Sequence, residues 1–149
     1  MKVYFDTNVL VAALQPDHIH HIPSFAALSS IRANNITGYM TGHGLAELYS
    51  VLTRTPFVKR IFADEAQIMI EQTIVPSFQI IEVTTQSYLA AIDLCAKAGW
   101  KGGRIHDAVH IQAALQAECD LIYTYNLADF HALAPTQASR IQTPPEESR

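Results

Sequence analysis

Cysteine is scarce in this chain, and so are long apolar runs. The two cysteines, Cys95 and Cys119, are too few for a disulfide framework, which makes a reducing cytoplasm the simplest compartment. No run approaches the roughly 18 apolar residues that a membrane-spanning helix needs. Asp6 places a charge where the core of a signal peptide would have to be apolar. We therefore expect a cytoplasmic protein without a membrane segment.

Basic residues are few as well, with 10 Lys and Arg against 14 Asp and Glu and a formal net charge of −4. A simple polyanion-binding module normally carries a basic excess, so the charge balance argues against one. The 49% hydrophobic content argues against disorder. A length of 149 residues suits one domain that buries its core without disulfides or metals.

Strand and helix patterns alternate along the chain, and no internal repeat is visible. The β-prone runs are 3–5, 36–40, 78–83, 121–124 and 140–142. The helical patterns are 8–14 with Thr7 as N-cap, 23–32, 42–54, 57–74, 85–98 and 104–118. This alternation predicts an α/β fold, a parallel sheet with helices on both faces. Residues 1–142 are expected to form the domain, and 143–149, which lack apolar residues, a flexible tail.

Four acidic residues fall where predicted strands end or where the following helices begin. Asp6 directly follows the first strand, and Asp129 lies five residues beyond the strand that ends at residue 124. Glu47 and Asp107 lie in early turns of two predicted helices. Ligand sites in parallel sheets form beyond the carboxyl ends of the strands, so the four carboxylates are expected at one rim.

A cluster of carboxylates needs something to offset its charge, because each one raises the pKa of its neighbours. Hard divalent cations such as Mg²⁺ are suited to this, and two of them can activate a water and stabilise the leaving oxygen of a phosphodiester. Taken singly, each acid also has a plainer interpretation as a solvated surface residue or a helix cap. Asp6 and Glu47 fit that interpretation less well, because apolar neighbours make an unpaired charge costly there.

Four short segments resemble, in order, the motifs of the PIN domain, the nuclease fold of VapC-type toxins in bacterial toxin–antitoxin pairs. They read YFDTNVL at 4–10, HGLAELY at 43–49, RIHDA at 104–108 and TYNLADF at 124–130. Each motif is weak alone, but their order and spacing make the set specific. The resemblance covers the chain from residue 4 to about residue 130.

The resemblance implies a three-layer α/β/α sandwich with a central, mainly parallel sheet. It also implies a Mg²⁺- or Mn²⁺-dependent ribonuclease whose catalytic and metal-binding acids are Asp6, Glu47, Asp107 and Asp129. The polar residues that support them would be Thr7, Asn8, Thr124 and Asn126. Many members of the family have Asp where this chain has Asn126, so Asp129 would supply the fourth carboxylate.

The partners implied by the resemblance are an RNA substrate, an antitoxin protein and a second copy of the chain. Three basic residues flank the acidic motifs and are candidates for phosphate contacts: Arg54, Lys101 and Arg104. The segment 57–74 is more apolar than one amphipathic face requires, which favours an interface there.

Two other functions stay open at this point. His106, Asp107 and His110 resemble a zinc-binding helix or the His-Asp pair of HD-type hydrolases. Zinc protease helices carry Glu after the first histidine and need a third ligand, and HD hydrolases are all-helical, which the strand patterns contradict. The plainer interpretation makes both histidines exposed or interface residues beside the acidic site. The third possibility is a PIN-like interaction module without catalysis.

The acidic motifs also modify the conclusion drawn from net charge. The four carboxylates together carry a charge of −4, which equals the net charge of the whole chain, and two divalent cations would cancel it. The net charge therefore does not exclude RNA. It predicts that RNA binding depends on metal.

Overall fold

Within residues 1–146, which are the part of the chain that the computed structural model describes, five short strands form a single sheet. The strands are β1 (Lys2–Phe5), β2 (Thr37–Thr41), β3 (Phe78–Ile81), β4 (Leu121–Tyr123) and β5 (Ile141–Gln142). Their spatial order is β3-β2-β1-β4-β5, and each neighbouring pair is parallel. The chain builds outward from β1 in both directions, which places the crevice expected for ligands between β1 and β4.

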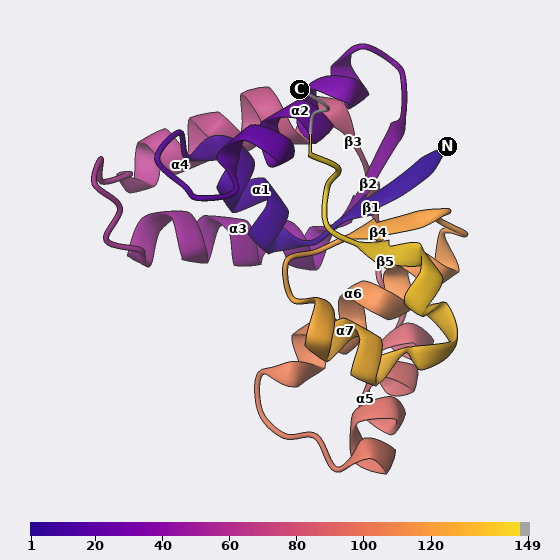
Figure 1. Ribbon diagram of the computed structural model, residues 1–149. Coiled ribbons are helices and arrows are strands. Elements are labelled where there is room, and N and C mark those ends of the chain that lie inside the picture. The colour runs from indigo at the N-terminus through magenta and orange to yellow at the C-terminus, as the bar shows by residue number, and fades with distance from the viewer. Residues whose placement is uncertain (147–149) are drawn as a thin grey trace.

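Helices lie on both sides of this sheet (Figure 1). One group is α1 (Thr7–Leu14), α2 (His21–Arg32), α3 (Gly42–Arg54) and α4 (Ala63–Met69). The other is α5 (Thr85–Ala98), α6 (Arg104–Gln116) and α7 (Leu127–Leu133). Shorter helical turns are η1 (Ile70–Ile74), η2 (Val75–Ser77) and η3 (Pro135–Arg140). The predicted three-layer α/β/α sandwich with a parallel sheet is confirmed.

The central strand β1 supplies side chains to two separate cores. Val3 and Phe5 pack among the buried residues of α1, α2 and α3, whereas Tyr4 packs among those of α5, α6 and α7. Successive side chains of a strand point to opposite faces of the sheet, so a strand covered on both faces must be apolar at every position. This requirement explains why the buried part of β1, residues 3–5, is a continuous apolar run rather than an alternating one.

The structure corrects several predicted element boundaries. The helix predicted over 57–74 begins only at Ala63 and ends in the π-helical turn η1. Its first turn carries Asp64 and Glu65, whose negative charges interact favourably with the helix dipole. The N-cap of α1 is Asp6 rather than Thr7, because the Asp6 carboxylate accepts the Thr7 N–H. Helix α7 was not predicted, since its seven residues are too few for a helical period to show.

Two further expectations concern the tail and the membrane. In the segment 143–149, Pro144 is buried, and residues 147–149 lie outside the described residues. Between residues 1 and 146, no helix combines the length and apolar character needed to cross a membrane.

Candidate active site

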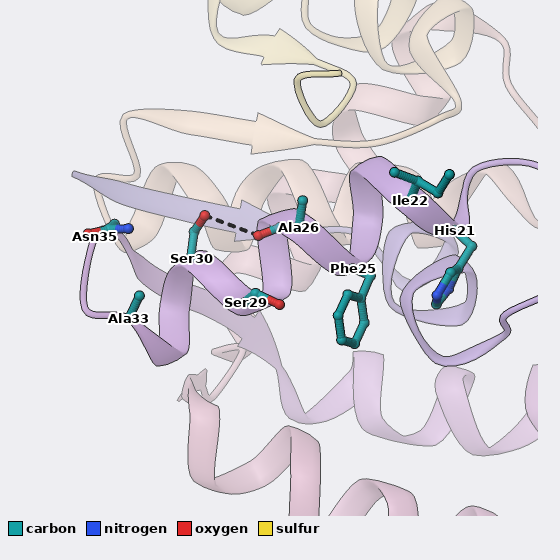
Figure 2. A pocket seen from close by; sticks show the side chains of 8 residues that line it. All are labelled: His21, Ile22, Phe25, Ala26, Ser29, Ser30, Ala33 and Asn35. Carbon is teal, nitrogen blue, oxygen red and sulfur yellow. Dashed lines mark hydrogen bonds between the residues drawn. The ribbon is translucent and has the colours of Figure 1, made fainter. Parts of the chain in front are cut away.

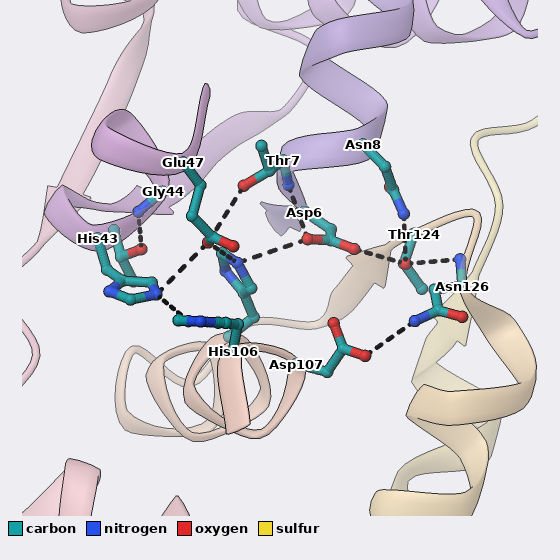
Figure 3. A network of polar contacts seen from close by, with 12 residues as sticks. Asp6, Thr7, Asn8, His43, Gly44, Glu47, His106, Asp107, Thr124 and Asn126 are labelled. Atoms are coloured by element: carbon teal, nitrogen blue, oxygen red, sulfur yellow. Dashed lines mark hydrogen bonds and ion pairs between the residues drawn. The ribbon is translucent and has the colours of Figure 1, made fainter. Parts of the chain in front are cut away.

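Asp6 occupies the junction between β1 and α1 and is the most buried of the predicted acids, with 4% of its surface exposed. One carboxylate oxygen accepts the Thr7 N–H at 2.7 Å, and the other accepts the Thr124 hydroxyl at 2.8 Å (Figure 3). Burial raises the pKa of Asp6, although the charge on His110 and the hydrogen bond from Thr124 work in the opposite direction. The carboxylate is therefore held in place at an electrostatic cost.

Glu47 reaches the same place from α3, the helix that follows β2. Its Oε1 atom lies 2.6 Å from His110 Nε2, and the Thr7 hydroxyl donates to it at 3.5 Å. Burial alone would raise the pKa of Glu47, but the hydrogen bond and charge of His110, with the charge of His43, lower it below its ordinary value. Glu47 is therefore ionised at neutral pH.

Asp107 enters from the first turn of α6. Its Oδ2 atom accepts a hydrogen bond of 2.8 Å from the side-chain amide of Asn126. Burial and the nearby charge of Asp6 raise the pKa of Asp107 to about 6. Burial is the larger cause, and the charges of Asp6, Asp129 and Glu47 add to it.

The three acids line one pocket of about 440 Å³ at the carboxyl edge of the sheet, together with Thr7 and Asn8. They come from three different elements, as Figure 3 shows. An all-oxygen donor set of this kind fits Mg²⁺ or Mn²⁺, which prefer carboxylates and retain several waters. Part of the rise in the pKa of Asp107 comes from neighbouring carboxylates, and a divalent cation would offset that part.

The fourth predicted acid, Asp129, lies at the edge of this group and does not line the pocket. Its carboxylate pairs with Arg104 at 3.1 Å, and the Arg104 guanidinium stacks on the Trp100 ring at 4.1 Å from the ring centre. Asp129 is close enough for its charge to raise the pKa of Asp107. The side chain that contacts Asp107 directly is that of Asn126.

The predicted supporting residues form a connected network around Asp6. The Thr124 hydroxyl, which donates to Asp6, also accepts the Asn126 backbone N–H at 2.9 Å and the Asn8 side-chain amide at 3.4 Å. Asn8 in turn accepts the backbone N–H of Tyr125 at 3.2 Å. The network ties the start of α1 to the end of β4 and thereby fixes the crevice between β1 and β4.

His110 is the residue whose role the sequence did not indicate. It was expected to be exposed or at an interface, but it is 1% exposed. Its Nδ1 atom lies 2.5 Å from the Tyr4 hydroxyl and its Nε2 atom lies 2.6 Å from Glu47. Its spacing of four residues from His106 puts both on one side of α6, and only the full fold shows that the second histidine enters the core.

The alternative zinc group His106, Asp107 and His110 is not assembled in the described part of the chain. The cluster of possible metal ligands found among residues 1–146 is instead His43, Glu47 and His106. His110 is held between Tyr4 and Glu47. The remaining predicted basic residues, Arg54 and Lys101, are exposed.

The fold and the pocket define a class of protein, a three-layer α/β/α domain with an acidic pocket at the carboxyl edge of its parallel sheet. Residues 3–134 match the PIN domain family. The chain belongs to this family. Comparison of the sequence with curated proteins gives no match.

Several solved structures are similar to this chain. FitAcB from Neisseria gonorrhoeae is 19% identical with a TM-score of 0.64, over 95% of this chain and 96% of that one. VapBC2 from Rickettsia felis, bound to a DNA fragment from its promoter, is 19% identical with a TM-score of 0.63, over 87% and 91%. VapC20 from Mycobacterium tuberculosis, a toxin that cleaves the sarcin-ricin loop, is 17% identical with a TM-score of 0.67, over 87% and 93%. At these identities the likeness establishes the fold.

Replacing Asp107 by Asn is expected to raise the melting temperature of the metal-free protein by roughly 2–5 °C at pH 8. The pKa of Asp107 is raised to about 6, so above that pH the side chain is ionised in surroundings that disfavour the charge, which costs folding stability. Asn removes the charge and keeps an acceptor for Asn126. The same change should abolish the stabilisation that Mn²⁺ gives the wild type.

Differential scanning calorimetry with chelator and with Mn²⁺ measures both effects. Asp93→Asn, at an exposed residue paired with Lys97, is the matched control and should behave as the wild type. A lower melting temperature for Asp107→Asn in chelator, or an unchanged response to Mn²⁺, would contradict the expectation.

Replacing His110 by Leu is expected to lower the free energy of unfolding by about 2–4 kcal/mol, because it leaves the Tyr4 hydroxyl and Glu47 without their buried partner. The double variant with Tyr4→Phe lacks the unpaired hydroxyl. Its loss in free energy of unfolding should therefore be smaller, by about 1 kcal/mol, than the sum of the losses in the two single variants. Urea unfolding followed by circular dichroism measures the cycle. Simple additivity would show that the Tyr4–His110 contact contributes nothing.

Proposed function

We propose that this protein is a metal-dependent endoribonuclease, the toxin of a type II toxin–antitoxin pair. The observation that carries the proposal is the convergence of Asp6, Glu47 and Asp107 on one pocket of a PIN domain. Similarity in fold to VapC20, a toxin that cleaves the sarcin-ricin loop, supports RNA as the substrate class.

In this proposal Asp6 and Asp107 would hold a Mg²⁺ or Mn²⁺ ion. Glu47 and Asp129, the latter after release from Arg104, would hold a second ion or orient the attacking water. When bound, the metal supplies an activated water and offsets charge that develops on the phosphate. Other residues of the chain hold the metal-binding carboxylates in position. Thr124 fixes the Asp6 carboxylate, and Asn126 fixes that of Asp107.

The RNA backbone would be held by basic side chains outside the pocket. Arg54 and Lys101 are exposed, and Arg104 is held at the rim by Trp100 and Asp129. Contacts to phosphate position a strand without reading its sequence. We propose these three residues as phosphate contacts that orient the RNA toward the acids.

The decisive experiment compares cleavage of total cellular RNA by the wild type and by Asp6→Asn, each with Mg²⁺, Mn²⁺ or EDTA. Asn keeps the oxygen that caps α1 but removes the charge, so we expect a loss of at least about 100-fold in rate with a fold that is intact by circular dichroism. EDTA should stop the wild type. Asp93→Asn should cleave normally.

Wild-type rates in Asp6→Asn would refute the assignment of the site. A wild type that cleaves nothing with either metal would favour the non-catalytic interaction module. Cleavage that persists in EDTA but needs zinc retained through purification would favour the zinc hydrolase.

We also propose that the protein forms a homodimer and binds an antitoxin, through two exposed apolar surfaces. The first, the α3–α4 surface, has a pocket lined by Leu45, Tyr49 and Ile70, with Phe62 and Ile68 exposed beside it. The second, the α2 surface, is a pocket of about 450 Å³ with Ile22 and Phe25 at one end (Figure 2). The first includes the segment whose sequence predicted an interface, and we assign the homodimer to it.

The α2 surface is then left for the antitoxin. Ile22 and Phe25 are 70% and 51% exposed and lie one turn apart on the helix, as Figure 2 shows. A pocket with these apolar anchors at one end and with polar residues such as Ser29 and Ser30 along it suits an amphipathic peptide segment that packs along the helix.

Light scattering at micromolar concentrations is expected to give twice the mass of one chain for the wild type. Ile68→Asp should give a single chain, because it places a charge in the proposed dimer contact. Phe25→Asp, a matched change at a residue of similar exposure on α2, should remain a dimer. A monomeric wild type would exclude the homodimer, and dissociation by Phe25→Asp alone would move the contact to α2.

A further inference from the structure

Beside the acidic pocket, a second group of polar side chains meets at the protein surface. His43 and Glu47 project from the same face of α3, one turn apart, and His106 meets them from the start of α6 (Figure 3). His43 Nε2 is 2.9 Å from His106 Nδ1 and 3.6 Å from Glu47 Oε1. One ligand atom from each of the three residues lies within 4.8 Å of the others.

These separations match those of ligands around one small metal ion. Two nitrogens bound to Zn²⁺ at about 2.0–2.1 Å with a tetrahedral angle are about 3.3 Å apart. The observed distances of 2.9 Å and 3.6 Å lie on either side of this value. The third separation, between Glu47 and His106, is at most 4.8 Å, so side-chain adjustment alone would bring all three atoms onto one ion.

The chemistry of this group differs from that of the acidic pocket. Two imidazoles and one carboxylate suit zinc and similar transition metals, whereas carboxylates alone suit Mg²⁺ and Mn²⁺. His106 is exposed, and His43 and Glu47 are partly exposed, so an ion has access and a water can take the fourth position. Neither imidazole is needed to fill the core.

We propose that His43, Glu47 and His106 form a binding site for a transition-metal ion of the zinc class, distinct from the acidic pocket but sharing Glu47 with it. In the metal-free protein Glu47 Oε1 is engaged by His110 at 2.6 Å. An ion on His43 and His106 would compete for that oxygen. If the proposed nuclease function holds, micromolar Zn²⁺ should therefore inhibit the Mg²⁺-dependent reaction.

The test uses Co²⁺ as a spectroscopic probe with the full-length protein, because Co²⁺ in a tetrahedral site with imidazole ligands absorbs visible light strongly and octahedral Co²⁺ does not. We expect the wild type to develop this absorption with one equivalent of Co²⁺ and to lose it when Zn²⁺ is added. His43→Gln and His106→Gln should bind at least about tenfold more weakly. Circular dichroism checks that both variants fold.

The controls separate this site from others that bind metal. His20→Gln changes the histidine-rich segment at the start of α2, which carries His18, His20 and His21, and should leave the Co²⁺ spectrum unchanged. Asp6→Asn and Asp107→Asn should also keep the spectrum, because neither residue belongs to the site. Wild-type RNA cleavage by Asp6→Asn would refute the assignment of the acidic pocket as the nuclease site without affecting this result.

Three outcomes would overturn the proposal. The first is a wild type with no tetrahedral Co²⁺ spectrum, which would leave the two histidines as a hydrogen-bonded contact between α3 and α6. The second is an unchanged affinity in both His43→Gln and His106→Gln. The third is a loss of binding in His20→Gln alone, which would assign the metal to the histidine-rich segment.

Discussion

The burial of one carboxylate, that of Asp6, is the constraint on which the rest of the site depends. It lies where β1 ends and α1 begins, between two cores that share the apolar strand before it. A buried charge is stable only if fixed dipoles or charges surround it. The backbone of α1 and the hydroxyl of Thr124 provide two such partners. Because Thr124 follows β4, satisfying Asp6 also fixes the spacing of the two strands that border the crevice.

The predictable part of the site is the part that secondary structure alone positions. Asp6 directly follows a strand, and Glu47 and Asp107 lie near helix starts, so the direction of parallel strands brings all three to one edge. The position of Asp129 depends instead on α7, a helix too short to leave a period in the sequence, and on its ion pair with Arg104. No pattern along the chain indicates such a pairing between side chains.

The fold was predictable to a similar degree and for the same reason. The alternation of strands and helices fixed the layers, because a parallel sheet needs its helices on both faces. The predicted start of α4 was several residues too early, because the apolar residues between 57 and 62 continue the helical pattern of the sequence but are not helical. Ile61 lies in this non-helical segment and is nevertheless buried. Burial there reflects packing of the chain against the core and does not require a helix.

His110 shows how the two cores act on the same site. Its partner Tyr4 is the one β1 side chain that points into the α5–α7 core, and through His110 that core reaches Glu47 on α3. Glu47 thus receives hydrogen bonds or charge from both layers, which explains why its pKa is lowered while that of Asp107 is raised. Because Glu47 stays ionised while Asp107 resists ionisation, the carboxylate oxygens of Glu47 carry no proton and are available to a cation. Under the two metal-site proposals, Glu47 is the acid for which two different metal ions would compete.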